Sequence, residues 1–129
     1  MPTLVNGKRQ NGKRGGGWIT KERRLAIYLR DEFRCAYCGC DLHGAHPRQL
    51  NLDHLVPRIH KGTNESSNLV LACLPCNASR QDKAVHHFAT GGALKRIANL
   101  KRRSMTKYLR LAKAILAGQT GTPDSESAR

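Results

Sequence analysis

The chain has few aromatic residues and no long apolar run. Its 129 residues include only two Phe, three Tyr and one Trp, which leaves little surface on which unpaired bases could stack. No stretch approaches the ~18 apolar residues of a membrane span, and no apolar segment follows Met1. We therefore expect a soluble, cytoplasmic protein with no membrane partner, whose cysteines stay reduced.

Acidic residues are also scarce. The chain has 9 Asp and Glu against 23 Lys and Arg, which gives a formal net charge of +14. This excess fits a polyanionic partner, and nucleic acid is the first candidate. Together with the shortage of aromatic residues, it favours contact with the phosphates of double-stranded DNA over stacking on single strands. On charge alone, a basic protein that is merely soluble is the alternative.

Four of the five cysteines form two Cys-x-x-Cys pairs. Cys35 and Cys38 make the first pair, and Cys73 and Cys76 make the second. In a reducing compartment, two such pairs around a compact segment indicate a closed tetrahedral zinc site; incidental pairs or a redox pair are the alternatives. A structural zinc would stabilise a chain whose core must be small. Cys40 is left over, and we interpret it as a non-ligand.

The apolar pattern predicts a small α+β domain. Residues 18–30 have the stripe of a short amphipathic helix, with Thr20 as a suitable N-cap. Residues 52–56 and 69–72 have strand length and should pair as a hairpin around a long polar loop. A second helix should start near Asn77. The ends of the strands and the first turn of that helix would then converge.

The two ends of the chain differ in composition from this core. Residues 1–17 are rich in Gly, Lys and Arg, which predicts a flexible basic arm before a folded domain over residues 18–90. After a glycine pair that should break the chain, residues 91–117 keep helical spacing and predict one or more basic amphipathic helices packed on the core. Residues 118–129 are predicted to be a disordered polar tail.

A set of polar residues between and beside the cysteine pairs could carry chemistry. Hydrolysis of a phosphodiester needs a base that activates water and a cation that neutralises charge on the phosphate. His54 is suited to be the base, because imidazole titrates near neutral pH. Asp53 and Asn77 offer the oxygen ligands that magnesium or manganese prefers. Asn68 could hydrogen-bond either the loop or the His54 ring and so fix the orientation of that ring.

Basic residues lie close to this set in sequence. We predict from their position and charge that they contact DNA phosphates; they are Arg58, Lys61, Arg80 and Lys83. Each polar residue of the set would, taken alone, be interpreted as structural. Their joint occurrence beside two cysteine pairs indicates a catalytic site.

The pattern resembles that of HNH endonucleases with the ββα-metal fold and a four-cysteine zinc site. The resemblance covers about residues 18–83 and rests on the segments 34–39 (Arg-Cys-Ala-Tyr-Cys-Gly), 52–58 (Leu-Asp-His-Leu-Val-Pro-Arg), 68–73 (Asn-Leu-Val-Leu-Ala-Cys) and 76–77 (Cys-Asn), with Gly62 and Lys83. It implies small ββα architecture with flanking α-helices. Cleavage by such an enzyme would leave a 3′-hydroxyl and a 5′-phosphate.

The resemblance also implies a role for each residue of the set. Asp53 and Asn77 would hold the catalytic metal, His54 would activate water, and Asn68 would position His54. Asn77 stands where the family's second histidine is expected, which makes the site HNN-type. Such a site suits magnesium or manganese better than metals that favour imidazole.

The sequence thus predicts a metal-dependent DNA endonuclease in a phage, restriction or mobile-element setting. A zinc-stabilised nucleic-acid-binding module without catalysis is the alternative, although binding alone has no need of a base beside a metal ligand. One active site cuts one strand at a time. Cleavage of both strands would therefore call for a homodimer, a larger phage or restriction assembly, or two encounters.

Overall fold

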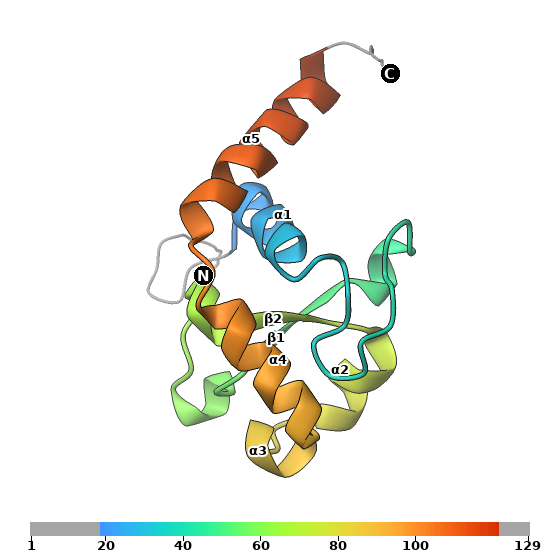
Figure 1. Ribbon diagram of the computed structural model, residues 1–129, viewed down its shortest axis with the longest axis vertical. Helices are drawn as coiled ribbons and strands as arrows, with labels where there is room; N and C mark the ends of the chain where they lie inside the picture. The colour runs from blue at the N-terminus through green and yellow to red at the C-terminus, as the bar shows by residue number, and fades with distance from the viewer. Residues whose placement is uncertain (1–18, 122–129) are drawn as a thin grey trace, which may run out of the picture.

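A two-stranded antiparallel sheet lies at the centre of an α+β structure. The computed structural model describes residues 19–121, with side chains through residue 118. Strands β1 (Asn51–His54) and β2 (Leu69–Ala72) form the sheet, and helices surround it (Figure 1). The predicted arm at 1–17 and residues 122–129 of the predicted tail lie outside the described residues.

Helix α1 (Lys21–Arg30) has the N-cap that the sequence predicts. The Thr20 hydroxyl accepts a hydrogen bond from the Arg23 backbone N–H at 3.1 Å. The apolar stripe of the helix, with Ile27 completely buried, packs against β2 and against α5 (Met105–Gly121). The first and last described helices therefore lie side by side, and α1 also contacts the sheet (Figure 1).

A buried ion pair joins the end of α1 to β2. Arg30 is 1% exposed and Asp31 is 3% exposed, and Arg30 Nε lies 2.7 Å from Asp31 Oδ1. Asp31 Oδ2 accepts the Leu71 N–H at 2.7 Å, and Arg30 donates to Leu69 O at 2.6 Å. Burial raises the pKa of Asp31 although the hydrogen bond and charge of Arg30 act the other way. Desolvation thus outweighs attraction at this site, and each charge depends on its partner.

The hairpin matches the prediction except at the end of its first strand. The second strand spans the predicted residues 69–72 and is completely buried. The register pairs Asp53 with Val70 and His54 with Leu69. The first strand ends at His54 and not at residue 56, because the Val56 N–H bonds to a side chain at 2.8 Å instead of to a strand.

Helix α2 (Leu74–Arg80) begins earlier than predicted. Cys73 is its N-cap, and Pro75 lies in its first turn, where a missing N–H costs no helical hydrogen bond. The helix ends where Gln81 adopts a φ of 50°, in the left-handed region. It packs against β1. A short helix that the sequence did not reveal, α3 (Val85–Phe88), follows it.

The C-terminal helical region consists of two helices. Helix α4 (Gly91–Lys101) starts at the glycine pair that was expected to break the chain, because the Thr90 hydroxyl accepts the Ala93 N–H at 3.1 Å and caps the helix. Its Ile97 packs into the core that includes the sheet. Helix α5 continues through Gly121, beyond residue 117 where the sequence predicts its end.

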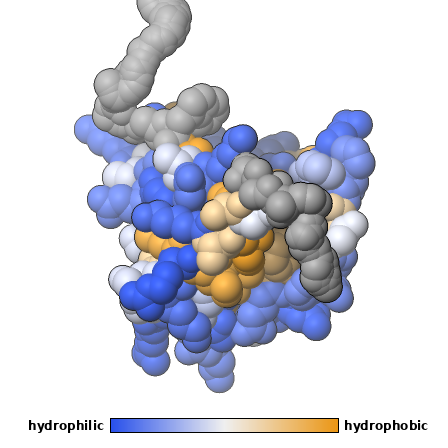
Figure 2. Space-filling view, turned by 90° about the horizontal axis from the view of Figure 1, so that it is seen from above, coloured by the Kyte–Doolittle hydropathy of each residue, from blue (hydrophilic) through white to orange (hydrophobic). Residues whose placement is uncertain are grey.

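The outside of this structure is mainly polar. Figure 2 shows a face that is largely hydrophilic around a central group of apolar side chains. Within residues 19–121, no helix combines the length and the apolar character needed to cross a bilayer.

We expect Asp31→Ala to lower the free energy of unfolding by about 3–5 kcal/mol, because it leaves the Arg30 charge buried and the Leu71 N–H unpaired. Urea unfolding followed by circular dichroism measures the change. Glu32→Gln is the matched control, since it weakens an exposed ion pair with Arg103 and should cost less than about 1 kcal/mol. Equal losses in the two variants would contradict this assignment.

Candidate metal and catalytic site

The four paired cysteines come together in one cluster. The Sγ atoms of Cys35, Cys38, Cys73 and Cys76 all lie within 4.8 Å of one another, and those of Cys38 and Cys73 are 3.8 Å apart. A tetrahedral zinc ion with Zn–S bonds of about 2.3 Å separates its ligands by about 3.8 Å, so the four thiols could hold one such ion. Cys40 is exposed and is not part of this cluster.

Local backbone geometry forms the first cysteine knuckle. Gly39 has a φ of 78°, and its N–H bonds to Cys35 O at 2.9 Å. Burial acts to raise the pKa of Cys38, but hydrogen bonds from Cys40 and the neighbouring thiols outweigh it and lower the pKa to about 7. Burial and the hydrogen bond to Cys38 raise the pKa of Cys40 to about 12. Burial also raises the pKa of Cys35 and that of Cys76, so position in the cluster, and not pKa, separates the four candidate ligands from Cys40.

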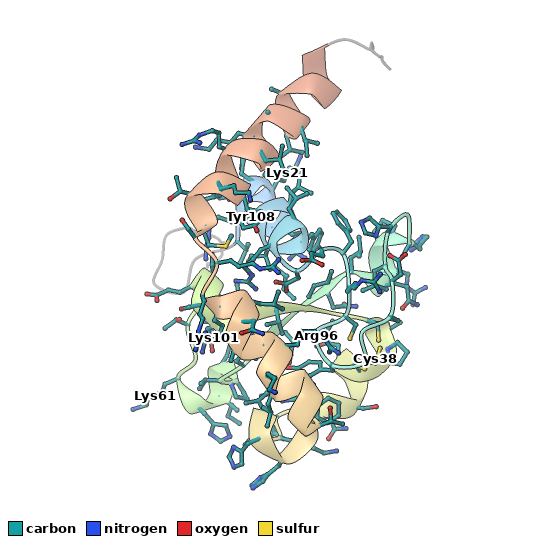
Figure 3. The ribbon with its side chains drawn as sticks, viewed as in Figure 1. Lys21, Cys38, Lys61, Arg96, Lys101 and Tyr108 are labelled. Atoms are coloured by element: carbon teal, nitrogen blue, oxygen red, sulfur yellow. The ribbon has the colours of Figure 1, made fainter. Side chains whose placement is uncertain are left out.

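Two arginines lie against this knuckle. Arg96 of α4 donates to Ala36 O at 2.8 Å, and Arg34 donates to Gly39 O at 3.2 Å. Figure 3 shows Arg96 on α4, beside the loop that carries Cys38. Helix α4 is thus tied directly to the cysteine cluster.

Asp53 lies in a buried polar network. Its Oδ2 accepts hydrogen bonds from the Tyr37 hydroxyl and from Arg80 Nη1. Arg80 also donates to the Tyr37 oxygen at 2.8 Å, to His54 O at 3.0 Å and to Leu55 O at 2.7 Å. Burial, and after it the Asp53 carboxylate, raises the pKa of Tyr37 above its usual range, so the phenol keeps its proton and donates.

This network contradicts the prediction that Arg80 contacts DNA. The Arg80 side chain is 0% exposed, and all of its described bonds are internal. Charge and position in the sequence could not distinguish this arginine from a surface one. The one available signal in the sequence was the spacing of three residues between Asn77 and Arg80. This spacing puts the two side chains on the same side of α2.

The other three basic candidates are exposed. Arg58 Nη1 lies 3.4 Å from Asn64 Oδ1, and Lys83 Nζ lies 5.8 Å from the centroid of the Phe88 ring. The Lys61 ammonium makes no hydrogen bond or ion pair within residues 19–118, although the Lys61 backbone N–H bonds to Arg58 O at 2.9 Å. All three remain predicted phosphate contacts.

The predicted metal ligands keep unused oxygen atoms. Asp53 Oδ1 accepts no hydrogen bond from the part of the chain that the structure describes, because Tyr37 and Arg80 both bond to Oδ2. The Asn77 side chain makes no described hydrogen bond either, including any to Asp53, and it lies one turn before Arg80 on α2. Carboxylate and amide oxygens suit magnesium or manganese, so these residues fit such an ion with one oxygen each, and waters and phosphate would complete the coordination.

His54 is oriented by Asn64, a residue that the sequence did not reveal. His54 Nε2 lies 2.7 Å from Asn64 Oδ1. Because this amide oxygen can only accept, the neutral ring carries its proton on Nε2 and keeps a lone pair on Nδ1. Arg23 of α1 donates to Asn64 O and anchors this part of the loop. In the sequence, Asn64 has the appearance of an ordinary loop residue.

Asn68 binds the loop and not the His54 ring, so its effect on His54 is indirect. Its Oδ1 accepts the Val56 N–H at 2.8 Å, and its Nδ2 donates to Val56 O at 3.1 Å and to Thr63 O at 2.8 Å. At Gly62, an added Cβ would lie 1.6 Å from Val56 O, so only glycine fits there. Of the two partners that the sequence left open for Asn68, the structure favours the loop.

Comparison with known proteins identifies the segment that carries this site. Residues 35–83 match the family model described as HNH endonuclease. This segment of the chain is thus similar to HNH endonucleases, in agreement with the resemblance in the sequence, and it includes both cysteine pairs. The searches of curated proteins and of solved structures gave no significant match.

We expect Cys35→Ser or Cys76→Ser to release zinc and unfold the domain, because apparent zinc-binding energies of about 10–16 kcal/mol also stabilise the fold. Metal analysis and circular dichroism measure both effects. Zinc should also leave as the pH falls, since protons compete for the thiolates. Cys40→Ser is the control and should keep its zinc. Full retention of zinc by Cys35→Ser would show that the ligands are misassigned.

Proposed function

We propose that this protein is a metal-dependent DNA endonuclease whose HNH domain hydrolyses phosphodiester bonds with His54 as the general base. The observation that carries the proposal is the contact between His54 Nε2 and Asn64 Oδ1 at 2.7 Å, which leaves Nδ1 able to accept a proton. This contact lies within the segment that matches the HNH family. Within the described residues, the structure gives His54 Nδ1 no hydrogen-bond partner, as a general base requires.

Residues around His54 would hold the reacting groups in place. Asp53 and Asn77 would bind magnesium or manganese, which when bound neutralises charge on the phosphate and the leaving oxygen. Arg80 and Tyr37 both bond to Oδ2 of Asp53, which leaves Oδ1 available. His54 would take the proton of the attacking water at Nδ1, and Asn64 would keep the ring in the matching tautomer.

The remaining features support a stable enzyme that acts on DNA. The four cysteines would hold a structural zinc, separate from the catalytic metal. The formal charge of +14 supports binding to phosphates of double-stranded DNA. Arg58, Lys61 and Lys83 are exposed around the site and would make such contacts.

One observation favours the second candidate, a DNA-binding module without catalysis. The charge of Asp53 is already compensated by buried Arg80, which weakens its attraction for a divalent cation. A module of this kind would keep the zinc cluster and the basic surface. It would leave the proton-accepting atom of His54 without a function.

A nicking assay on supercoiled plasmid separates the two candidates. With magnesium or manganese, the wild type should convert the plasmid to open circles, and EDTA should stop the reaction. His54→Ala should lower the rate by about 10²–10⁴-fold, because it removes the base. His86→Ala, which removes an exposed histidine of α3, should cut like the wild type. If the wild type binds plasmid but never nicks it with either metal, the module without catalysis is the correct description.

Asn64→Ala should lower kcat by about 10- to 100-fold with little change in KM, because the His54 ring loses the bond that sets its tautomer. Asn64→Asp should retain more activity but shift the acidic limb of the pH–rate profile to higher pH, since a carboxylate favours the protonated ring. Steady-state kinetics across pH measure both effects. Wild-type kcat in Asn64→Ala would exclude Asn64 as a positioning residue.

A further inference from the structure

We propose that a pocket between the loop that joins β1 to β2 and the end of α4 binds one backbone phosphate of the DNA, at a distance from the bond that is cut. This inference rests on the proposed function and adds Lys101 to the residues that contact the substrate. The pocket has a volume of about 230 Å³, and its polar lining consists of Lys61, Thr63, Ser67, Asn68 and Lys101.

The pocket has the composition of an anion site. Two ammonium groups and two hydroxyl groups line it, and none of its lining residues is acidic. Lys61 comes from the loop after β1 and Lys101 from the last turn of α4, 40 residues further along the chain; both lie on the same side of the molecule (Figure 3). The fold therefore brings together two positive charges that are remote in sequence.

These two charges are not neutralised within the described part of the chain. Neither the Lys61 nor the Lys101 ammonium makes a hydrogen bond or an ion pair with residues 19–118. The pocket beside Arg96 differs, because its lining includes Asp31 and Glu32. Glu32 pairs there with Arg103 at 2.8 Å. Charge complementarity thus favours an anion in the pocket of Lys61 and Lys101.

The walls of the pocket are already fixed. Asn68 holds Val56 and Thr63 by three hydrogen bonds of 2.8–3.1 Å, and Gly62 lies directly against the Val56 carbonyl. A phosphate that enters the pocket therefore does not have to order the loop, which removes one cost of binding. Only the two lysine side chains would lose freedom.

The position of the pocket links it to the catalytic residues. Thr63 lines the pocket and precedes Asn64, which bonds to the His54 ring at 2.7 Å. A phosphate held here would fix the DNA strand relative to His54 without any contact to bases, so the pocket would add affinity and register but no sequence preference. The preferred substrate is then a polynucleotide that extends beyond the bond that is cut.

Salt dependence of DNA binding tests this inference without cleavage. The protein carries His54→Ala and is studied in EDTA-free buffer with calcium in place of magnesium, and the ligand is a short fluorescein-labelled duplex. Lys61→Gln, Lys101→Gln and the double variant are compared by the slope of log K against log salt. Because both lysines would share one phosphate, we expect the double variant to lose about 0.9 in slope in total, and not the sum of two separate losses.

The variants Lys95→Gln and Lys101→Gln, made singly and together, show the loss of slope expected when two lysines act independently. Lys95 is exposed on the same helix as Lys101 but does not line the pocket. Any slope losses from Lys95→Gln and Lys101→Gln should therefore add. Zinc content and urea unfolding should match among all variants, which excludes loss of fold as the cause of weaker binding.

The other outcomes are distinct. If the double variant keeps the slope of the parent protein, or if the losses from Lys61→Gln and Lys101→Gln add fully, the shared phosphate site is wrong while DNA binding stands. If the parent protein binds the duplex with an affinity indifferent to salt, or does not bind it, the proposed function fails as well.

Discussion

The geometry of the site depends on the buried guanidinium of Arg80. It bonds to Asp53 on β1, to the Tyr37 oxygen beside the cysteine knuckle, and to Leu55 O after the strand, and its Nε donates to Lys83 O at 2.5 Å. A guanidinium is planar and presents its N–H donors in fixed directions, so these partners are held in a defined arrangement. One cation thereby fixes α2, β1 and the knuckle relative to one another, and the two predicted metal ligands belong to this rigid frame.

Asp53 and His54 are adjacent in the sequence but form hydrogen bonds with different groups. Asp53 turns toward Tyr37 and Arg80, whereas His54 turns toward Asn64, as alternation along a strand requires. The strand ends at His54, and the loop that follows is held by Asn68. The proposed metal ligand and the proposed base can therefore occupy adjacent positions, because each has its own polar support.

The sequence predicted those features that depend on spacing along the chain. The two cysteine pairs form one cluster, residues 69–72 form a strand, and Thr20 caps a helix, because each is set by a short local pattern. Other features depend on tertiary contacts that a short window does not contain. Arg80 meets a carboxylate 27 residues away, and the glycine pair after Thr90 becomes helical because the cap outweighs its low propensity.

The same limit explains why the positioning residues of the site were only partly found. Asn68 stood out because it directly precedes an apolar strand, but its partners in the loop could not be chosen from the sequence. Asn64 had no signal at all, since its role follows from the path of a 3-10 turn and a loop that returns to His54. The roles proposed for Asn64 and Asn68 rest on the hydrogen bonds of their side chains and not on their positions in the sequence.

Metal binding at the four-cysteine cluster would also change the net charge of the protein. Four thiolates around one divalent ion carry two negative charges more than the ion neutralises, so a loaded cluster lowers the formal charge of +14 by about two. Arg34 and Arg96, which donate to the knuckle carbonyls, lie where they offset this local excess. Two of the 23 cationic side chains would then serve as counter-ions, and the loaded protein should migrate as a less basic species than its metal-free form.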